Sequence, residues 1–314
     1  MDTFEFSETS ARSSFGAALE DGLGRSPKSI PPKFFYDHEG SLLFEQICRL
    51  PEYYVTRTEF ALLDRLAPAF AEIIGPEAEL IEFGAGEARK VRFILDALDR
   101  PNTFIPIDIS SDYLAGTAAD LRRHYPNLNV QPVAGDFTQP LDLGPASGRR
   151  VGFFPGSTIG NFEPEAAREF LARAAELLAG GGLLIGVDLV KDPAVLHAAY
   201  NDTAGVTARF NLNLLARANR ELGLAFDLDA FRHYAFYNPL YRRIEMYLVS
   251  TKRQSVALPW RAASFEEGEP ILTEHSYKYT IEGFQELSRK AGFSPRQVWV
   301  DPERLFSLHW LASS

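Results

Sequence analysis

The amino-acid sequence predicts an α/β fold, an open, doubly wound, Rossmann-like sheet with a second, α+β part inserted into it. Two observations predict the sheet: short apolar segments alternate with helix-like stretches over residues 80–187, and a glycine-rich turn follows the first apolar segment. A third observation predicts the insertion, because the alternation stops after Asp188 and resumes only near Thr280. The residues between these two points therefore interrupt the sheet along the chain.

The expected strands and helices follow one another in the order that a parallel sheet requires, with helices on both of its faces. The helix expected over 164–178 is rich in alanine, leucine, glutamate and arginine, which favour helices. The last helix and the last two strands are expected to complete the same sheet. The expected strands are 80–83, 104–108, 130–133, 151–154, 183–187, 297–300 and 305–311, and the other expected helices are 89–98, 111–123 and 280–291.

Two further parts of the chain flank this pattern. Thr56 and Glu59 have the spacing of a capping box and precede apolar residues at helical spacing, so a helix is expected to begin near Thr56. The insertion contains a long helix-like segment, 193–222, and a β-prone segment, 243–249. The aromatic cluster 34–36, which follows two prolines, is expected to pack against the insertion.

Composition and charge exclude several classes of protein. Of 314 residues, 46% are hydrophobic and 24% charged, as in ordinary globular proteins, and the net charge of −10 disfavours a nucleic-acid partner. The N-terminus lacks a basic region followed by an apolar stretch, and no apolar run is long enough to span a bilayer, so we expect a cytoplasmic protein without a membrane partner. Cys48 is the only cysteine and the six histidines show no paired ligand spacing, so no metal is expected. With no heptad seam, a monomer is expected.

The glycine-rich turn and two acidic residues predict a nucleotide-type cofactor site. Gly84 and Gly86 let a ligand approach the backbone closely, and Arg89 stands where a dinucleotide motif needs a third glycine. Asp108 ends the second strand, where a carboxylate accepts hydrogen bonds from ribose hydroxyls. Asp136 and Phe137 follow the third strand, where they would bind an adenine ring. Each aspartate alone could be a helix cap or a loop residue, but the ordered set favours S-adenosylmethionine over NAD.

Several uncommon strings outside this cofactor motif carry a resemblance to a known family. Together they resemble the histidine-specific α-N-methyltransferases of ergothioneine biosynthesis, over the chain from about residue 27 to its end. The strings are Ser29-Ile30-Pro31-Pro32-Lys33-Phe34-Phe35-Tyr36-Asp37, Leu50-Pro51-Glu52-Tyr53-Tyr54-Val55-Thr56-Arg57-Thr58-Glu59, Phe154-Pro155-Gly156-Ser157-Thr158-Ile159-Gly160-Asn161-Phe162 and Val187-Asp188-Leu189-Val190-Lys191-Asp192, with Ala204-Gly205-Val206-Thr207-Ala208-Arg209-Phe210-Asn211 and Leu272-Thr273-Glu274-His275-Ser276.

The resemblance implies a class I S-adenosylmethionine-dependent methyltransferase domain, 58–191 with 279–314, and a substrate-binding domain, 1–57 with 192–278. It implies trimethylation of L-histidine at the α-nitrogen, to hercynine, with S-adenosylhomocysteine as the second product. Asn161 and Tyr200 would hold the substrate carboxylate, Tyr53 would lie near the amine as the catalytic residue, and Glu274 and Ser276 would bind the imidazole. Tyr36, Phe44, Gly156, Thr158 and Met246 would help to shape the pocket, and Gly84, Gly86, Lys90, Asp108, Asp136 and Phe137 would bind the cofactor.

The residues are also compatible with simpler interpretations. Asn161 could be the N-cap of the helix before Pro164, Tyr53 could be a core aromatic residue, and a Glu-x-Ser pair is often an ordinary solvated strand face. No residue is a compelling base for the protonated amine, so Tyr53 would orient it while water takes the proton.

Three other functions remain open at this point. The first is α-N-methylation of another amino acid, such as tryptophan or a derivative. Glu274 argues against it, because an indole has less use for a carboxylate, although Val55, His275 and Tyr277 depart from the family pattern. The others are an NAD-dependent oxidoreductase on a similar sheet, and a protein that binds the amino acid or S-adenosylmethionine without turnover.

Overall fold

The computed structural model describes residues 8–259 and 261–314, in two compact units. Unit 1 consists of Met1–Tyr54 and Lys191–Tyr277, and unit 2 of Val55–Val190 and Lys278–Ser314. The N-terminal residues on which the expectation of no export signal depends lie outside the described residues. In the described part of the chain, no helix is long and apolar enough to cross a membrane.

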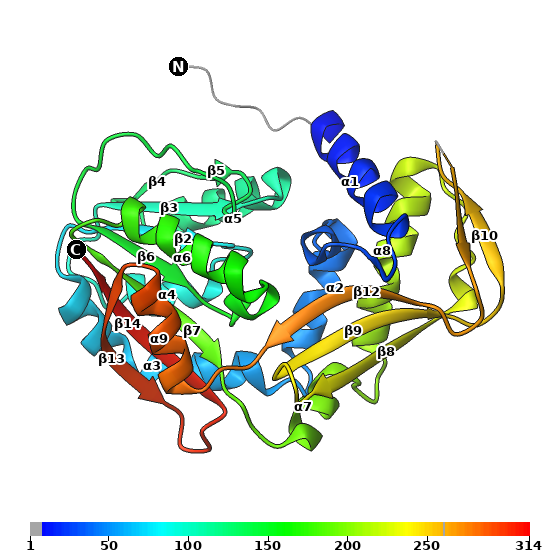
Figure 1. The fold of residues 1–314 in the computed structure, drawn as a ribbon. Helices are drawn as coiled ribbons and strands as arrows, with labels where there is room; N and C mark the ends of the chain where they lie inside the picture. The colour runs from blue at the N-terminus through cyan, green and yellow to red at the C-terminus, as the bar shows by residue number, and fades with distance from the viewer. Residues whose placement is uncertain (1–7, 260) are drawn as a thin grey trace. The chain divides into compact units, whose positions relative to one another are not determined.

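Unit 2 is built on an eight-stranded sheet in the order β13-β14-β7-β6-β2-β3-β4, with β5 also paired to β3 (Figure 1). The six strands β7, β6, β2, β3, β4 and β5 pair in parallel. β14 runs antiparallel to both of its neighbours, β7 and β13. The alternating strands and their completion by the C-terminal part are therefore confirmed. The strand bounds are β2 Glu79–Phe83, β3 Thr103–Asp108, β4 Asn129–Val130, β5 Val133–Ala134, β6 Arg150–Phe154, β7 Gly182–Asp188, β13 Phe293–Val300 and β14 Phe306–Ser313.

One expected strand is wrong in detail. Residues 130–133 form two short strands, β4 and β5, instead of one. The interruption falls at Gln131 and Pro132, and proline has no N–H to donate to a neighbouring strand.

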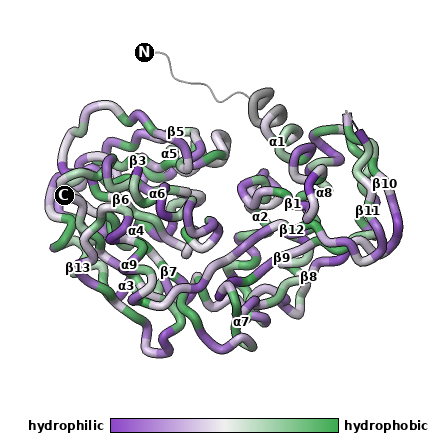
Figure 2. The backbone as a smooth tube through the Cα atoms, viewed as in Figure 1, coloured by the Kyte–Doolittle hydropathy of each residue, from purple (hydrophilic) through white to green (hydrophobic). Residues whose placement is uncertain are grey.

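Helices cover both faces of this sheet, as a parallel sheet requires. On one face, α6 and α9 lie in front of the strands in Figure 1 and share an apolar core with β2, β6 and β7. Its centre is aromatic: the rings of Phe83, Phe154 and Phe170 lie within 6.0 Å of one another, centroid to centroid. β7 is mainly hydrophobic in Figure 2 and fully buried. The helices are α3 Tyr54–Ile74, α4 Arg89–Leu95, α5 Ser111–His124, η2 Thr158–Asn161, α6 Pro164–Leu177 and α9 Ile281–Lys290.

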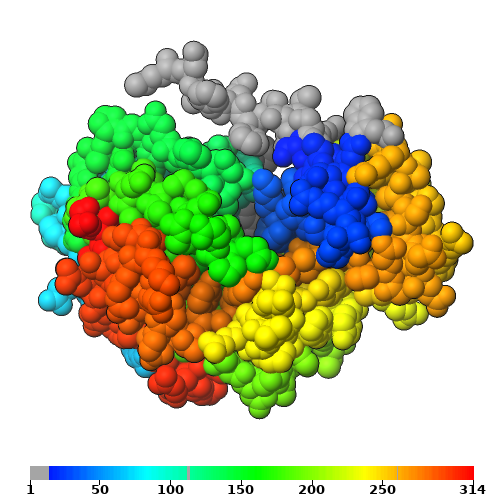
Figure 3. All heavy atoms as spheres, in the orientation of Figure 1, coloured from blue at the N-terminus to red at the C-terminus, as the bar shows by residue number. Residues whose placement is uncertain are grey.

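Unit 1 is an α+β structure around a sheet in the order β1-β12-β9-β8. The N-terminal segment joins it directly, because β1 pairs in parallel with β12, and residues 14–50 and 250–277 lie side by side in Figure 3. Its strands are β1 Lys28–Ser29, β8 Phe231–Asn238, β9 Arg243–Ser250, β10 Gln254–Ala257, β11 Ala262–Phe265 and β12 Pro270–Tyr277. Its helices are α1 Glu8–Leu23, η1 Pro32–Phe35, α2 His38–Cys48, α7 Pro193–Tyr200, α8 Val206–Leu222 and η3 Leu228–Ala230.

The expected helix 193–222 is two helices, α7 and α8, because residues 201–205 break it. Asp202 lies in this break. Its carboxylate accepts hydrogen bonds from Val206 N and Thr207 N at 2.8 Å, and so caps the first turn of α8. The packing of the aromatic cluster 34–36 on the insertion is confirmed, since the ring of Phe35 stacks on Phe210 at 4.4 Å.

The chain leaves and re-enters unit 2 at neighbouring points. Leu189 and Tyr279 form a parallel bridge, and Tyr279 N donates to the carbonyl of Asp188 at 3.0 Å. Lys278 and Asp188 form an ion pair at 2.9 Å in which both side chains are 1% exposed. The two connecting segments are thus joined within unit 2 by a charge pair that is cut off from water.

We expect Lys278→Met to lower the free energy of unfolding by about 3–5 kcal/mol, because it leaves the Asp188 carboxylate buried without its cation. Urea unfolding followed by circular dichroism measures the loss. The control is Lys290→Met, which removes an ion pair with Glu286 in which both side chains are 64% exposed and should change stability little. Equal losses in the two variants would contradict the prediction.

Candidate active site

The glycine-rich turn lies where the strand order of unit 2 reverses. The chain runs from β2 to β3 on one side and later returns to β6 on the other side of β2, and ligands of open α/β sheets bind at such a point. Gly84 and Gly86 have φ of 73° and 50°, in the region that favours glycine. A Cβ on Gly86 would meet no atom within 4 Å, so the space above the turn is open.

Asp108 ties the end of β3 to this turn. Its carboxylate accepts hydrogen bonds from Gly86 N and Ser110 N, each at 3.0 Å. Burial raises the pKa of Asp108, and these backbone hydrogen bonds oppose the rise only in part. Asp108 therefore lies beside the open turn, as expected of a ribose-binding carboxylate.

Phe137 lies close to the same turn. A Cβ on Gly84 would come within 3.3 Å of its ring, and the ring packs against Phe154 at 5.5 Å. The neighbouring Asp136 accepts a hydrogen bond from Thr138 N at 2.9 Å, which shapes the loop after β5. The structure thus brings Phe137 to the glycine turn, where a flat ligand ring would lie.

Lys90, on α4, takes part in a buried charge cluster. Its Nζ lies 2.7 Å from Oε2 of Glu59, whose side chain is wholly buried on α3. Both oxygens of Glu59 also lie within 3.0 Å of Gly156 N, at the turn after β6. The expected capping box is therefore wrong: α3 begins at Tyr54, before Thr56, and Glu59 binds Lys90 and Gly156 instead of a helix end.

Glu82 is a further member of this cluster that the sequence analysis missed. It is 1% exposed on β2, and its Oε2 is buried without a hydrogen-bond partner. Burial raises the pKa of Glu82 well above the ordinary range, Lys90 lowers it, and the negative charges of Asp108 and Glu59 raise it. A signal was present, because a strand buried on both faces normally lacks charged residues.

The segment after β6 carries Gly156, Thr158 and Asn161. Ser157 has a φ of 57°, and its Oγ accepts a hydrogen bond from Asp188 N at 2.8 Å. The Thr158 hydroxyl donates to the Pro155 carbonyl at 3.1 Å. Asn161 ends η2 and is not the N-cap of α6, which is Glu163. The structural interpretation of Asn161 as a helix cap is thus excluded.

The other expected substrate residues gather in unit 1. Tyr36, Phe44 and Tyr53 form a chain of edge-on rings, with centroids 5.6 and 6.3 Å apart. Tyr200, at the end of α7, lies 6.5 Å from Tyr53, ring to ring, and its hydroxyl donates to Ser276 Oγ at 2.8 Å. Burial raises the pKa of Tyr53 well above its ordinary value, helped by nearby groups that include Tyr200 and Glu274. Tyr53 therefore stays a neutral phenol.

A β-bulge directs Glu274 toward this cluster. On β12, Leu272 pairs with Tyr247 and Glu274 with Met246, so Thr273 is an extra residue. The bulge places Glu274 on the opposite face from Leu272, whereas an unbroken strand would place them on the same face. Glu274 and Ser276 then share a face with Met246, and they are 8% and 4% exposed. The ordinary solvated-face interpretation of this pair is excluded.

His233 is a second residue that the sequence analysis missed. One ring nitrogen, Nε2, lies 2.9 Å from the carbonyl of Tyr200, and the other lies 3.0 Å from Asn211 Nδ2. Burial lowers the pKa of His233, so the ring is neutral, donates to Tyr200 and accepts from Asn211. This bond fixes the backbone of Tyr200. One histidine on a strand carries no recognisable sequence signal.

The sheet order of unit 2, with its last strand antiparallel between β7 and β13, and the open glycine turn with an acid at the end of β3 define a class I methyltransferase. The residues fit S-adenosylmethionine: the space above Gly86 is open, Asp108 could bind the ribose and Phe137 could pack on the adenine. The buried Oε2 of Glu82 has no hydrogen-bond partner, which suits a cationic ligand. Among the described residues, no group of three or more metal-ligating side chains is present.

The profile of the family described as "Histidine-specific methyltransferase, SAM-dependent" matches residues 15–313, and the chain belongs to this family. A histidine N-alpha-methyltransferase of Mycolicibacterium smegmatis is 43% identical over 293 residues, which are 91% of each chain. The corresponding protein of Mycobacterium tuberculosis is 42% identical over the same shares. Ergothioneine biosynthesis protein 1 of Neurospora crassa is 31% identical over 92% of this chain and 33% of its own length.

The buried Glu82 predicts a pH dependence of stability. Above the ordinary carboxyl range the unfolded chain has lost this proton while the folded protein keeps it, so the free energy of unfolding falls as pH rises toward the folded pKa. We expect Glu82→Gln to remove this fall in the free energy of unfolding. Relative to the native protein, the free energy of unfolding of the variant should then rise by up to about 1.4 kcal/mol for each pH unit.

Urea unfolding at about pH 5 and about pH 7 measures the effect. The control is Glu165→Gln, because Arg168 lowers the pKa of the exposed Glu165 carboxyl, and this variant should gain nothing as pH rises. A Glu82→Gln variant with the same pH slope as the native protein would contradict the prediction.

Proposed function

We propose that this protein transfers methyl groups from S-adenosylmethionine to the α-amine of L-histidine and produces trimethylhistidine (hercynine) for ergothioneine biosynthesis. The observation that carries the proposal is the buried Glu274 on the same face as Ser276, beside a cluster of neutral aromatic side chains. A carboxylate and a hydroxyl on one face of a strand can each form a hydrogen bond with one of the two nitrogens of an imidazole ring. The names of the relatives, which refer to histidine and to ergothioneine, support the same substrate.

The proposed roles follow the two units. In unit 2, Gly84, Gly86, Lys90, Asp108, Asp136 and Phe137 would bind the cofactor. In unit 1, Glu274 and Ser276 would bind the imidazole, Met246 would pack against it, and Tyr36, Phe44 and Tyr53 would surround the amino-acid backbone. Tyr200 of unit 1 and Asn161 of unit 2 would bind the carboxylate. Gly156 and Thr158 of unit 2 would help to shape the pocket.

The chemistry places few demands beyond orientation. S-adenosylmethionine supplies an electrophilic methyl group on a sulfonium, and the amine lone pair has to lie in line with it. The amine must first lose a proton, and Tyr53 is a poor acceptor because burial keeps its phenol protonated. The phenol can still orient the nitrogen by a hydrogen bond. The proposal extends to a cytoplasmic monomer that needs no metal, acts on the free amino acid and binds no nucleic acid, which its net charge of −10 disfavours.

The deciding experiment is a competition. The purified protein is incubated with S-adenosylmethionine and an equimolar mixture of the common amino acids, and the products are identified by mass spectrometry. We expect histidine alone to gain methyl groups, three of them, with fragmentation placing them on the α-nitrogen. Methylation of tryptophan instead, or of no amino acid, would overturn the proposed substrate.

A pair of variants tests the imidazole site. Glu274→Gln keeps the shape of the side chain but removes the charge, so we expect histidine affinity to fall by roughly tenfold or more while cofactor affinity is unchanged. Calorimetric titration with histidine and with S-adenosylhomocysteine measures both.

The matched control is Glu245→Gln. Glu245 is 4% exposed, faces the opposite side of the same sheet and binds Arg243 at 2.8 Å. It should cost stability without a loss of histidine affinity. If the two variants weakened histidine equally, the imidazole would bind elsewhere.

A further inference from the structure

The wholly buried Glu59 lies at the reversal point of the sheet but belongs to neither the glycine turn nor the substrate cluster. It comes from α3, crosses to the turn after β6, and contacts β7 closely: a Cβ on Gly186 would come within 2.3 Å of its Oε1. Only glycine at position 186 leaves room for the carboxylate there. Burying a carboxylate is costly unless it is paired and hydrogen-bonded, so a close-packed site for Glu59 indicates a specific structural role.

Glu59 holds two parts of the cofactor edge at once. It accepts from the Gly156 backbone through both oxygens, at 2.9 and 3.0 Å, and pairs with Lys90 Nζ at 2.7 Å. The ammonium also lies directly over the turn, since a Cβ on Gly156 would meet Lys90 Nζ at 3.1 Å. The position of Lys90 is thus set by a carboxylate that lies beneath it.

Glu82 is the other buried carboxyl close to Lys90. Its Oε2 is buried without a hydrogen-bond partner, and burial raises its pKa well above the ordinary range. Glu59, by contrast, forms an ion pair with the ammonium at 2.7 Å. A lysine ammonium has three donors, so one that binds Glu59 can also donate to the carboxylate of a ligand's methionine part.

We propose that Glu59 is a positioning residue of the cofactor site, which holds Lys90 and the Gly156 turn in the arrangement that binds the methionine part of S-adenosylmethionine. The inference rests on the proposed cofactor role of Lys90. Glu59 acts through Lys90 and the turn and makes no contact with the cofactor itself.

The test uses S-adenosylhomocysteine as the probe, because it binds without reacting. Glu59→Gln keeps an oxygen for Gly156 N but loses the charge that holds Lys90, so we expect calorimetry to show an affinity at least tenfold weaker, about 1.4 kcal/mol. In steady-state kinetics the KM for S-adenosylmethionine should rise while kcat at saturating cofactor is largely kept.

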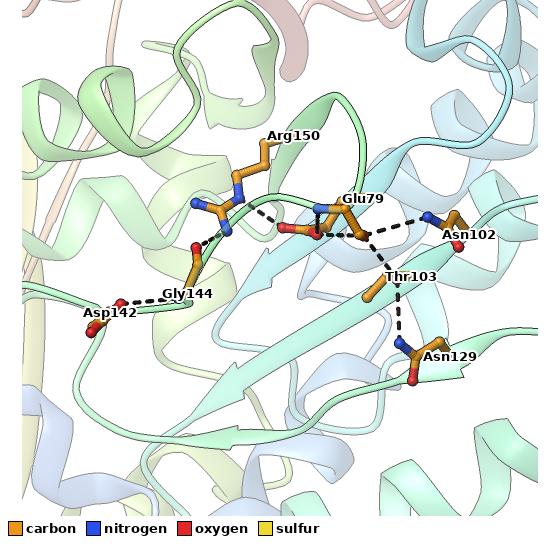
Figure 4. A network of polar contacts seen from close by, with 8 residues as sticks. Glu79, Asn102, Thr103, Asn129, Asp142, Gly144 and Arg150 are labelled. Carbon is orange, nitrogen blue, oxygen red and sulfur yellow. Dashed lines mark hydrogen bonds and ion pairs between the residues drawn. The ribbon is translucent and has the colours of Figure 1, made fainter. Parts of the chain in front are cut away.

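The matched control is Glu79→Gln, at the start of strand β2 and away from the glycine turn that follows its end. Glu79 is also buried; it accepts from Ser147 and pairs with Arg150 at 2.7 Å, in the network of Figure 4. Burial acts to raise the pKa of Glu79, but these partners outweigh it and lower the pKa. The control should lose thermal stability like Glu59→Gln and keep its affinity within about twofold.

A double variant tests the route of the effect. If Glu59 acts through Lys90, Glu59→Gln should weaken S-adenosylhomocysteine binding little further in a Lys90→Met background. Affinity unchanged in Glu59→Gln, equal losses in Glu59→Gln and Glu79→Gln, or additive losses in the double variant would each overturn the proposal. If Glu59→Gln does not fold, Glu59→Asp against Glu79→Asp gives the same comparison. Binding of the probe does not depend on the amino-acid substrate, so a failure of histidine as substrate would leave this test decisive.

Discussion

The reversal of strand order at β2 is the constraint on which the rest of unit 2 depends. Because β3 and β6 pair on opposite sides of β2 and all three run parallel, their carboxyl ends meet at one edge. The glycine turn, Asp108 and Gly156 follow those ends, although more than seventy residues separate the first from the last. In open α/β sheets this edge is where ligands bind.

That edge brings three carboxyl groups into a place that water reaches poorly. Glu59 forms an ion pair with Lys90, and burial raises the pKa of both Glu82 and Asp108. Buried carboxyl groups of this kind lower the stability of the fold, and such a loss is commonly found at functional sites, where a bound ligand can offset it. A cofactor with a sulfonium and an ammonium carries positive charge of the kind that would do so.

In unit 1, polar side chains are buried beside aromatic rings and have to be held in a fixed orientation there. It does so by local geometry: the bulge at Thr273 turns Glu274 and Ser276 to the face of Met246, and His233 fixes the backbone of Tyr200, whose hydroxyl reaches Ser276. Each polar group is buried with a defined partner or neighbour, which holds its orientation before a substrate binds. Neutral Tyr53 lies beside them without adding a charge.

The sequence alone determined the parts that depend on local pattern: the alternation that builds the sheet, the turn at Gly84 and Gly86, the acid that ends β3, and the family to which the strings belong. It also placed the insertion, because a change of periodicity is visible along the chain. The tertiary structure alone decided the partners of buried polar groups. Thr56 and Glu59 have the spacing of a capping box, yet Glu59 binds Lys90 and Gly156 from distant elements. The bulge before Glu274 and the hydrogen bonds of His233 could not be predicted either. Periodicity indicates which face of an element a residue occupies, but it does not identify the residue's partner on another element.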